Sequence, residues 1–193
     1  MSKPLYCFVG KSASGKTTVA NELEVYGFTQ LWSYCTRPKR YEFETGHTFI
    51  SEEEFSKLEN IIAYTEYNGY KYCATKEQID VSDVYVIDVS GIKTLLDKYK
   101  SDRSIVIFYF DTSVRTRIER MLNRHDSDMA IVSRLYNDEE YDWYDKLNSI
   151  VAEHNKTCII NDVELYKIDA NQDFNTVVEN VYSLILSETG TYQ

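Results

Sequence analysis

Apolar and polar positions divide the chain into two kinds of segment that alternate. Short apolar, β-branched runs predict strands buried on both faces, at residues 5–9, 28–34, 84–89, 105–110 and 158–160. The segments between them predict helices, at about residues 16–26, 91–100, 113–123, 128–154 and 174–187. Strands that alternate with helices predict an α/β fold with a parallel sheet.

Residues 35–75 interrupt this alternation. A basic loop leads into a short helix, for which Ser51 and Glu54 have the spacing of a capping box. Two short runs, 61–67 and 70–73, then flank Asn68-Gly69, a pair typical of hairpin turns. We therefore expect a small antiparallel subdomain inserted into the parallel one.

Residues 10–17, Gly-Lys-Ser-Ala-Ser-Gly-Lys-Thr, match the pattern G-x-x-x-x-G-K-[ST] of a phosphate-binding loop. The context is appropriate, because an apolar strand ends at Val9 and a helix begins near Lys16. Backbone amides and the helix N-terminus favour phosphate, Lys16 should reach the β- and γ-phosphates of ATP, and Thr17 should bind Mg²⁺. The predicted ATP-phosphate contacts are Gly10, Ser12, Ala13, Ser14, Gly15, Lys16, Thr17 and Thr18.

A second anion site is indicated after the second strand. Three cations, Arg37, Lys39 and Arg40, lie within four residues, and arginine offers a forked pair of donors to phosphate. Such a run can also be a solvated loop. Asp88 follows another apolar run, and the carboxyl ends of parallel strands border the ligand crevice. An aspartate that only caps a helix is the alternative there.

Together these motifs resemble the guanylate kinase family of nucleoside monophosphate kinases. After the phosphate loop, the matching pieces are 33–40, 46–51, 66–72, 87–91, an arginine-rich helix and 160–162. The resemblance implies a three-layer core at about 1–34, 76–111 and 135–193. It also implies a monophosphate-binding subdomain at about 35–75 and a helical lid at about 112–134.

The family's functional residues carry over by position. The implied contacts to the acceptor monophosphate are Ser33, Arg37, Arg40, His47, Glu66, Tyr72, Thr75 and Asp88. The implied ligands of Mg²⁺ are Thr17 and Asp88. The implied catalytic residues are Lys16, Arg37, Arg124 and Arg134. The reaction would be ATP + GMP giving ADP + GDP, with ATP and a nucleoside monophosphate as the implied small-molecule partners.

The lid arginines do not all favour the same interpretation. Arg117, Arg120 and Arg124 are spaced by three and four residues, so they share one helix face. For Arg115 and Arg117 we favour a basic surface helix paired with acids. In the family, arginines of the lid and the next helix neutralise the transferring phosphoryl group, and Arg124 and Arg134 match them best by position.

Departures from the family concern base specificity. Ala63 and Ala74 stand where the family has a glutamate and a hydroxyl residue that read guanine, unless Glu66 substitutes. Losing such a hydrogen bond can change substrate choice by orders of magnitude. A kinase for another (deoxy)nucleoside monophosphate is therefore the alternative. A non-catalytic interaction module is less favoured, because modules of this type lose the phosphate loop.

Charge and cysteine content narrow the remaining classes. The 193 residues carry 21 Lys+Arg and 31 Asp+Glu, a net charge of −10, which argues against nucleic acid or an anionic membrane as partner. Residues 1–134 carry a net charge of −1 and residues 135–193 a net charge of −9, and all eight arginines precede residue 135. Four dispersed cysteines and the absence of a long apolar stretch favour a cytoplasmic protein without a zinc site. For the oligomeric state, we expect either a monomer or a homodimer.

Overall fold

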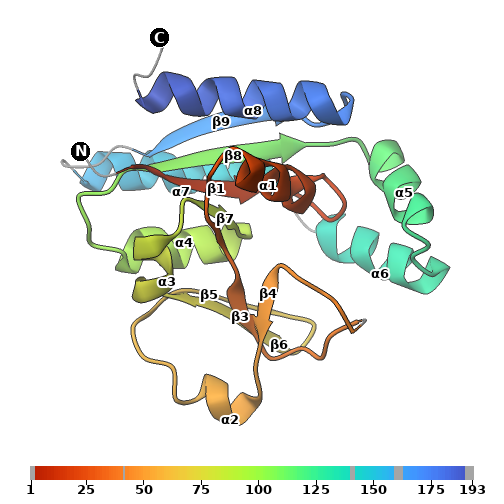
Figure 1. The fold of residues 1–193 in the computed structure, drawn as a ribbon, viewed down its shortest axis with the longest axis horizontal. Helices are drawn as coiled ribbons and strands as arrows, with labels where there is room; N and C mark the ends of the chain where they lie inside the picture. The colour runs from red at the N-terminus through yellow and green to blue at the C-terminus, as the bar shows by residue number, and fades with distance from the viewer. Residues whose placement is uncertain (1–2, 41, 140–141, 159–162, 190–193) are drawn as a thin grey trace.

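The computed structural model of the chain describes residues 3–40, 42–139, 142–158 and 163–189. A large sheet has five parallel strands in the order β2-β7-β1-β8-β9, and a smaller sheet has four strands in the order β4-β3-β6-β5 (Figure 1). The strands of the large sheet are β1 (Leu5–Val9), β2 (Gln30–Leu31), β7 (Val84–Val86), β8 (Ile105–Asp111) and β9 (Glu164–Asp169). Those of the small sheet are β3 (Ser33–Cys35), β4 (His47–Phe49), β5 (Ile61–Tyr67) and β6 (Tyr70–Thr75). The helices are α1 (Lys16–Val25), α2 (Glu52–Phe55), α3 (Lys76–Val81), α4 (Val89–Lys98), α5 (Val114–Asn123), α6 (Asp128–Glu139), α7 (Trp143–Thr157) and α8 (Phe174–Thr189).

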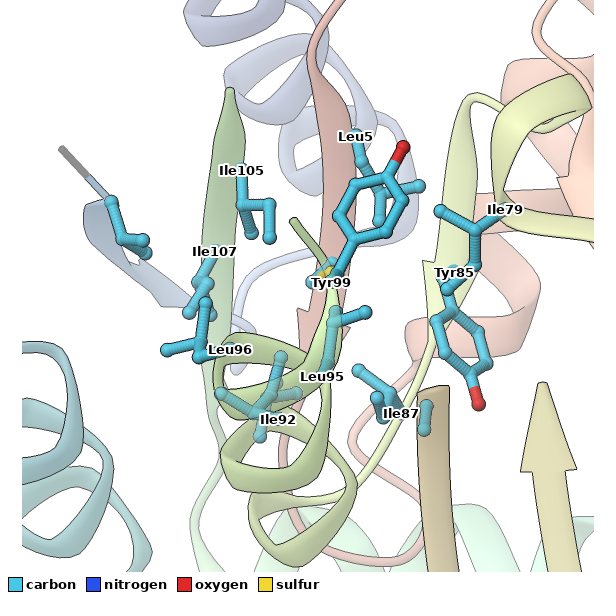
Figure 2. Close-up of a cluster of buried hydrophobic side chains, with 14 of the residues drawn as sticks. Leu5, Ile79, Tyr85, Ile87, Ile92, Leu95, Leu96, Tyr99, Ile105 and Ile107 are labelled. Carbon is cyan, nitrogen blue, oxygen red and sulfur yellow. The ribbon is translucent and has the colours of Figure 1, made fainter. Parts of the chain in front are cut away.

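The large sheet lies between two helical layers, as its strand pattern dictates. Successive side chains of β1 point to opposite faces, so Leu5 and Cys7 join one core while Tyr6 and Phe8 join the other. Helices α4 and α7 cover the first face, and α1 and α8 cover the second (Figure 1). Figure 2 shows α4 inserting its apolar side chains between β1, β8 and the small sheet. The α/β prediction with a parallel sheet is confirmed.

The two sheets meet at one residue. The sequence predicts a single strand over residues 28–34, and this is wrong, because the segment is broken at Trp32. Gln30 and Leu31 pair with β7 in the large sheet, whereas β3 pairs with β4 and β6 in the small one. The carbonyl of Trp32 accepts instead from the side chains of Gln78 at 2.9 Å and Thr48 at 3.2 Å. The backbone therefore passes directly from one sheet to the other.

The small sheet is mixed rather than antiparallel as predicted. The hairpin of β5 and β6 around Asn68-Gly69 is confirmed, but β3 and β4 run parallel. The capping box at Ser51 and Glu54 is present and begins α2. A second capping box, of Thr75 with Gln78, begins α3, which the apolar pattern did not predict.

The last third of the chain differs most from expectation. The single helix predicted over 128–154 is two helices, and Asp142 starts the second by accepting from the amides of Tyr144 and Asp145. Cys158 is the C-cap of α7 and lies in no strand, so the strand predicted over 158–160 is wrong at that residue, and 159–160 lie outside the described residues. The strand that the apolar pattern did not predict is β9, an edge strand. It mixes polar and apolar residues, whereas a strand buried on both faces is a continuous apolar run.

The division into core, monophosphate-binding subdomain and lid stays a prediction. The small sheet spans residues 33–75, and α5 and α6 project beyond the large sheet on the side of the carboxyl ends of β1 and β8 (Figure 1). Within the described residues, each helix is too short or too polar to cross a lipid bilayer.

Candidate active site

The loop between β1 and α1 has the geometry of a phosphate cradle. Gly15 is the N-cap of α1 with φ +98°, a left-handed conformation that favours glycine. At Gly10 a Cβ would lie 2.8 Å from the carbonyl oxygen of Phe110, so β8 approaches too closely for a side chain. Backbone conformation thus favours glycine at position 15, and packing requires it at position 10.

Lys16 is held against this loop at the start of α1. Its Nζ donates to the carbonyl oxygens of Gly10 at 2.7 Å and Lys11 at 2.9 Å, and to Ser14 Oγ at 3.1 Å. Burial lowers the pKa of Lys16 to about 8, although the nearby Asp138 carboxylate opposes the shift. The ammonium is therefore mostly charged at neutral pH, and it sits among acceptors that a phosphate oxygen could replace.

Two arginines of helix α5 donate hydrogen bonds to backbone carbonyls of the phosphate loop. Arg117 donates from Nε to the carbonyl of Ser12 at 2.8 Å, and Arg120 donates from Nη1 to the carbonyl of Ser14 at 3.0 Å. Arg115 pairs with Glu119 on the surface, as expected for a basic surface helix. The same interpretation is wrong for Arg117, which is 1% exposed. Its guanidinium donates instead to the Ser12 carbonyl and to Asp138 in the interior.

Asp138 on α6 completes this contact and was not predicted. Its carboxylate accepts from the Ser12 amide at 2.9 Å and from Arg117, and both side chains of the pair are buried. Ser12, Arg117 and Asp138 therefore form a closed ring of hydrogen bonds that ties α5 and α6 to the phosphate loop. The partners lie 126 and 21 residues from Asp138 along the chain, so local sequence patterns contain no signal for them.

Two pockets meet at Lys16. The first, of about 360 Å³, is bounded by the loop and start of α1, residues 13–19, together with Arg120, Arg124 and Phe174. The second, of about 210 Å³, lies between the large and small sheets, and Lys16 and Ser12 reach into it. Lys16 borders both, so one cation is shared by two cavities that open on either side of the loop.

Side chains of the small sheet form one wall of the second pocket. Ser33 Oγ lies 3.0 Å from His47 Nδ1, and the ring of Tyr72 packs edge-on against His47. Burial lowers the pKa of His47 to about 4, and the positive charge of Arg37 adds to the effect. The imidazole is therefore neutral at pH 7. This wall offers hydroxyl, imidazole and phenol groups without a net charge.

Asp88 lies on the opposite wall, at the end of β7. Its Oδ1 accepts from the Gly91 amide at 2.7 Å and caps α4, and burial raises its pKa above the ordinary value. Thr17 borders the first pocket. A threonine hydroxyl and a carboxylate are the oxygen donors that Mg²⁺ prefers. The described side chains contain no cluster of three or more His, Cys, Asp or Glu, so this donor set fits a cation that takes its other ligands from phosphates and water.

Arg37 and Arg40 lie beside the second pocket rather than in its wall. Arg37 makes a two-pronged ion pair with Glu44, with Nη2 to Oε1 at 2.8 Å and Nη1 to Oε2 at 2.9 Å. Burial acts to lower the pKa of Arg37, but the hydrogen bonds and charge of Glu44 raise it above the ordinary value. Tyr72, in the pocket wall, lies close enough to Arg37 to influence its pKa.

The two expected lid arginines share one carboxylate. Arg124 pairs with Asp126 closely, and Arg134 Nε lies 3.7 Å from Asp126 Oδ2. Arg124 also borders the first pocket, and the positive charge of Arg134 contributes to the lowered pKa of Lys16. Arg40 contributes to the lowered pKa of Asp126 as well, although the hydrogen bond from Arg124 is the main cause. The structure therefore places Arg124 and Arg134 around one acid, with Arg40 near enough to influence its pKa.

Not every predicted contact is brought to the second pocket. Glu66 is exposed on β5, where it accepts from Tyr64, and Thr75 is buried as the cap of α3. Ala63 and Ala74 are buried opposite each other on β5 and β6. The unpredicted members of the pocket wall are Tyr64, Thr65, Tyr67, Tyr85, Val86, Ile87, Gly91, Asp138 and Trp143.

Comparison with known proteins gives a likeness of fold. No protein-family model matches the chain, and no curated protein sequence matches it. Among solved structures, the fold is similar to the crystal structure of guanylate kinase from Anaplasma phagocytophilum, with a TM-score of 0.52 and 16% identity. The match covers 97% of this chain and 87% of that chain. At this identity the comparison establishes a shared α/β architecture.

Proposed function

We propose that this protein is a nucleoside monophosphate kinase that transfers the γ-phosphoryl group of ATP to GMP. The observation that carries the proposal is the pair of pockets that meet at Lys16 of the phosphate loop. A single-nucleotide hydrolase needs one such cavity, whereas a transferase between two nucleotides needs two that share the phosphate-binding cation. The fold of the guanylate kinase from Anaplasma phagocytophilum agrees with this proposal.

The chemistry requires positioning and charge neutralisation rather than a base. An oxygen of the acceptor phosphate, already ionised at pH 7, forms a bond to the γ-phosphorus while the bond to the β–γ bridging oxygen breaks, giving two diphosphates. Lys16 would stabilise the charge on the donor phosphates, and Arg124 and Arg134 would neutralise the transferring group. Thr17 and Asp88 would hold Mg²⁺, which supplies further charge neutralisation at the phosphates when bound.

The second candidate is the same reaction on another base. Ala63 and Ala74 are buried, Glu66 lies outside the second pocket, and the small-sheet wall is uncharged. These observations favour an acceptor that does not need a carboxylate on that wall to recognise it. The interaction-module alternative gains no support, because the phosphate loop keeps both its glycines and Lys16.

The test is a panel of ribo- and deoxynucleoside monophosphates in a coupled assay for ADP release. We expect turnover with GMP, and a loss of about 100-fold or more in Lys16→Met, because an electrostatic contact to the transition state is removed. Lys57→Met is the control, since Lys57 is exposed, pairs with Glu53 and borders neither pocket. Turnover of another base without GMP would select the second candidate, and unchanged turnover in Lys16→Met would refute both.

A further inference from the structure

Glu44 is buried beside the second pocket, and neither the motifs nor the resemblance assigns it a role. It lies in the loop between β3 and β4 and is 7% exposed, unusual for a glutamate. Its carboxylate accepts hydrogen bonds from both Nη groups of Arg37 and, at 2.7 Å, from the backbone amide of Arg40. Arg40 Nη1 lies 3.6 Å from Glu44 Oε1. One acid thus organises both arginines of the expected anion site.

The way Glu44 binds Arg37 leaves a defined edge of the guanidinium without a hydrogen bond to this carboxylate. Glu44 takes the end formed by Nη1 and Nη2, and the Pro38 carbonyl takes a further Nη1 hydrogen at 3.0 Å. The remaining edge is formed by Nε and the Nη2 hydrogen on the same side. Nε is buried and has no hydrogen-bond partner among the described residues. A planar edge of this kind matches two oxygens of a phosphate.

Other contacts fix the plane of this guanidinium. The ring of Phe49 lies 5.1 Å from Arg37 Cζ, and Tyr72 lies beside the same side chain. Burial would raise the pKa of Glu44, but the hydrogen bonds from Arg37 and Arg40 lower it, so the carboxylate stays ionised at neutral pH. Arg37, Arg40 and Glu44 then carry one net positive charge, enough to attract an anion without leaving two cations unpaired.

We propose that Glu44 is a positioning residue, which orients Arg37 so that its Nε edge receives the phosphate of the acceptor nucleotide. The inference rests on the proposed function for the identity of the ligand. Without Glu44, Arg37 would lose the partner that fixes its end, and the pair of donors would no longer be held at the pocket edge. Hydrogen bonds to charged groups of this kind correspond to about a 10- to 100-fold change in affinity.

The experiment measures the binding of GMP and of the other monophosphates by calorimetry, alongside steady-state kinetics. We expect Glu44→Gln to raise the Kd and KM for the acceptor about 10- to 100-fold, while the KM for ATP changes by less than about twofold. Glu52→Gln is the matched control, because Glu52 also pairs with a cation of the small sheet, Lys71, but is exposed. It should change neither constant.

A double substitution separates positioning from general stability. In an Arg37→Ala background, Glu44→Gln should weaken acceptor binding by less than about twofold, because the group it positions is gone. If Glu44→Gln does not fold, Glu44→Asp carries the test, and its shorter carboxylate should produce a loss of about tenfold. Unchanged acceptor affinity, or the same loss in the Arg37→Ala background, would overturn the inference.

Failure of the proposed function gives a different result. Wild-type protein that binds a monophosphate but does not phosphorylate it would refute the kinase proposal, while the calorimetric comparison would still support or overturn the role of Glu44. Wild-type protein that binds no monophosphate would overturn both.

Discussion

The buried ring of Ser12, Arg117 and Asp138 leads to a prediction about stability that does not depend on the function. Substituting Asp138 with asparagine keeps the shape of the side chain but removes its charge. Arg117 would then be a buried cation without a counter-ion, while the amide oxygen could take the place of Oδ2, which accepts from both the Ser12 amide and Arg117. We expect a large loss of stability from a change of a few atoms.

The magnitude follows from the burial of the pair. The two side chains are 1% and 3% exposed, so solvent screens neither charge. Breaking one partner of such a pair costs about 3–5 kcal/mol, and we expect the lower end, about 3 kcal/mol, because the asparagine oxygen can still accept both hydrogen bonds. For a chain of 193 residues, this corresponds to a fall in Tm of about 6–12 °C.

Urea denaturation followed by circular dichroism measures the free energy of unfolding directly. Glu119→Gln is the control, since it breaks the exposed pair with Arg115 on the same helix and should cost less than about 1 kcal/mol. An Arg117→Met single variant and the double variant complete the cycle, in which the two losses should not add. An effect of Asp138→Asn as small as that of Glu119→Gln would refute the argument from burial.

Three further predictions concern other parts of the site. His47 is neutral in the fold with a pKa of about 4, so the unfolded state takes up a proton first as the pH falls below 6.5. The free energy of unfolding should therefore fall by at most about 3 kcal/mol between pH 6.5 and 4. His47→Gln should flatten this part of a profile of urea midpoint against pH. Gly10→Ala would force a Cβ onto the Phe110 carbonyl and should destabilise the protein by about 1–3 kcal/mol in the same measurement; an unchanged midpoint would contradict the packing argument. Asp126→Asn should release the two lid arginines and tighten ATP binding by up to about fivefold in calorimetry, and weaker binding would show that Asp126 does not compete with phosphate.

The parts of the fold that sequence could predict are those controlled by neighbouring residues. The strand, loop and helix around Lys16, the hairpin at Asn68-Gly69 and the capping box at Ser51 each depend on contacts within a few positions. The break at Trp32 could not be read in the same way, because both halves of the segment are compatible with strand. Only the pairing with β7 on one side and β6 on the other separates them.

The candidate site shows the same limit. Lys16 and Ser33, which the motifs single out, line a common pocket, whereas the carboxylates that hold the cations were missed. Glu44 lies seven residues after Arg37 and could have been noticed as an acid within a basic loop. Asp138 could not, because its partners belong to a loop and a helix distant in sequence. Tertiary pairing of charges is decided by the fold, and one sequence does not encode it in a local pattern.

The passage of the chain between the two sheets at Trp32 has a practical consequence. We expect rotation of the small sheet relative to the large one to change the surroundings of the Trp32 indole, because the residue is 40% exposed and its backbone carbonyl is held by Thr48 and Gln78. The other tryptophan of the chain, Trp143, borders the second pocket. The protein thus carries two tryptophan fluorophores, one at the junction of the sheets and one at the second pocket. Single Trp→Phe variants would allow motion of the subdomain and occupancy of the pocket to be timed separately, without an attached label.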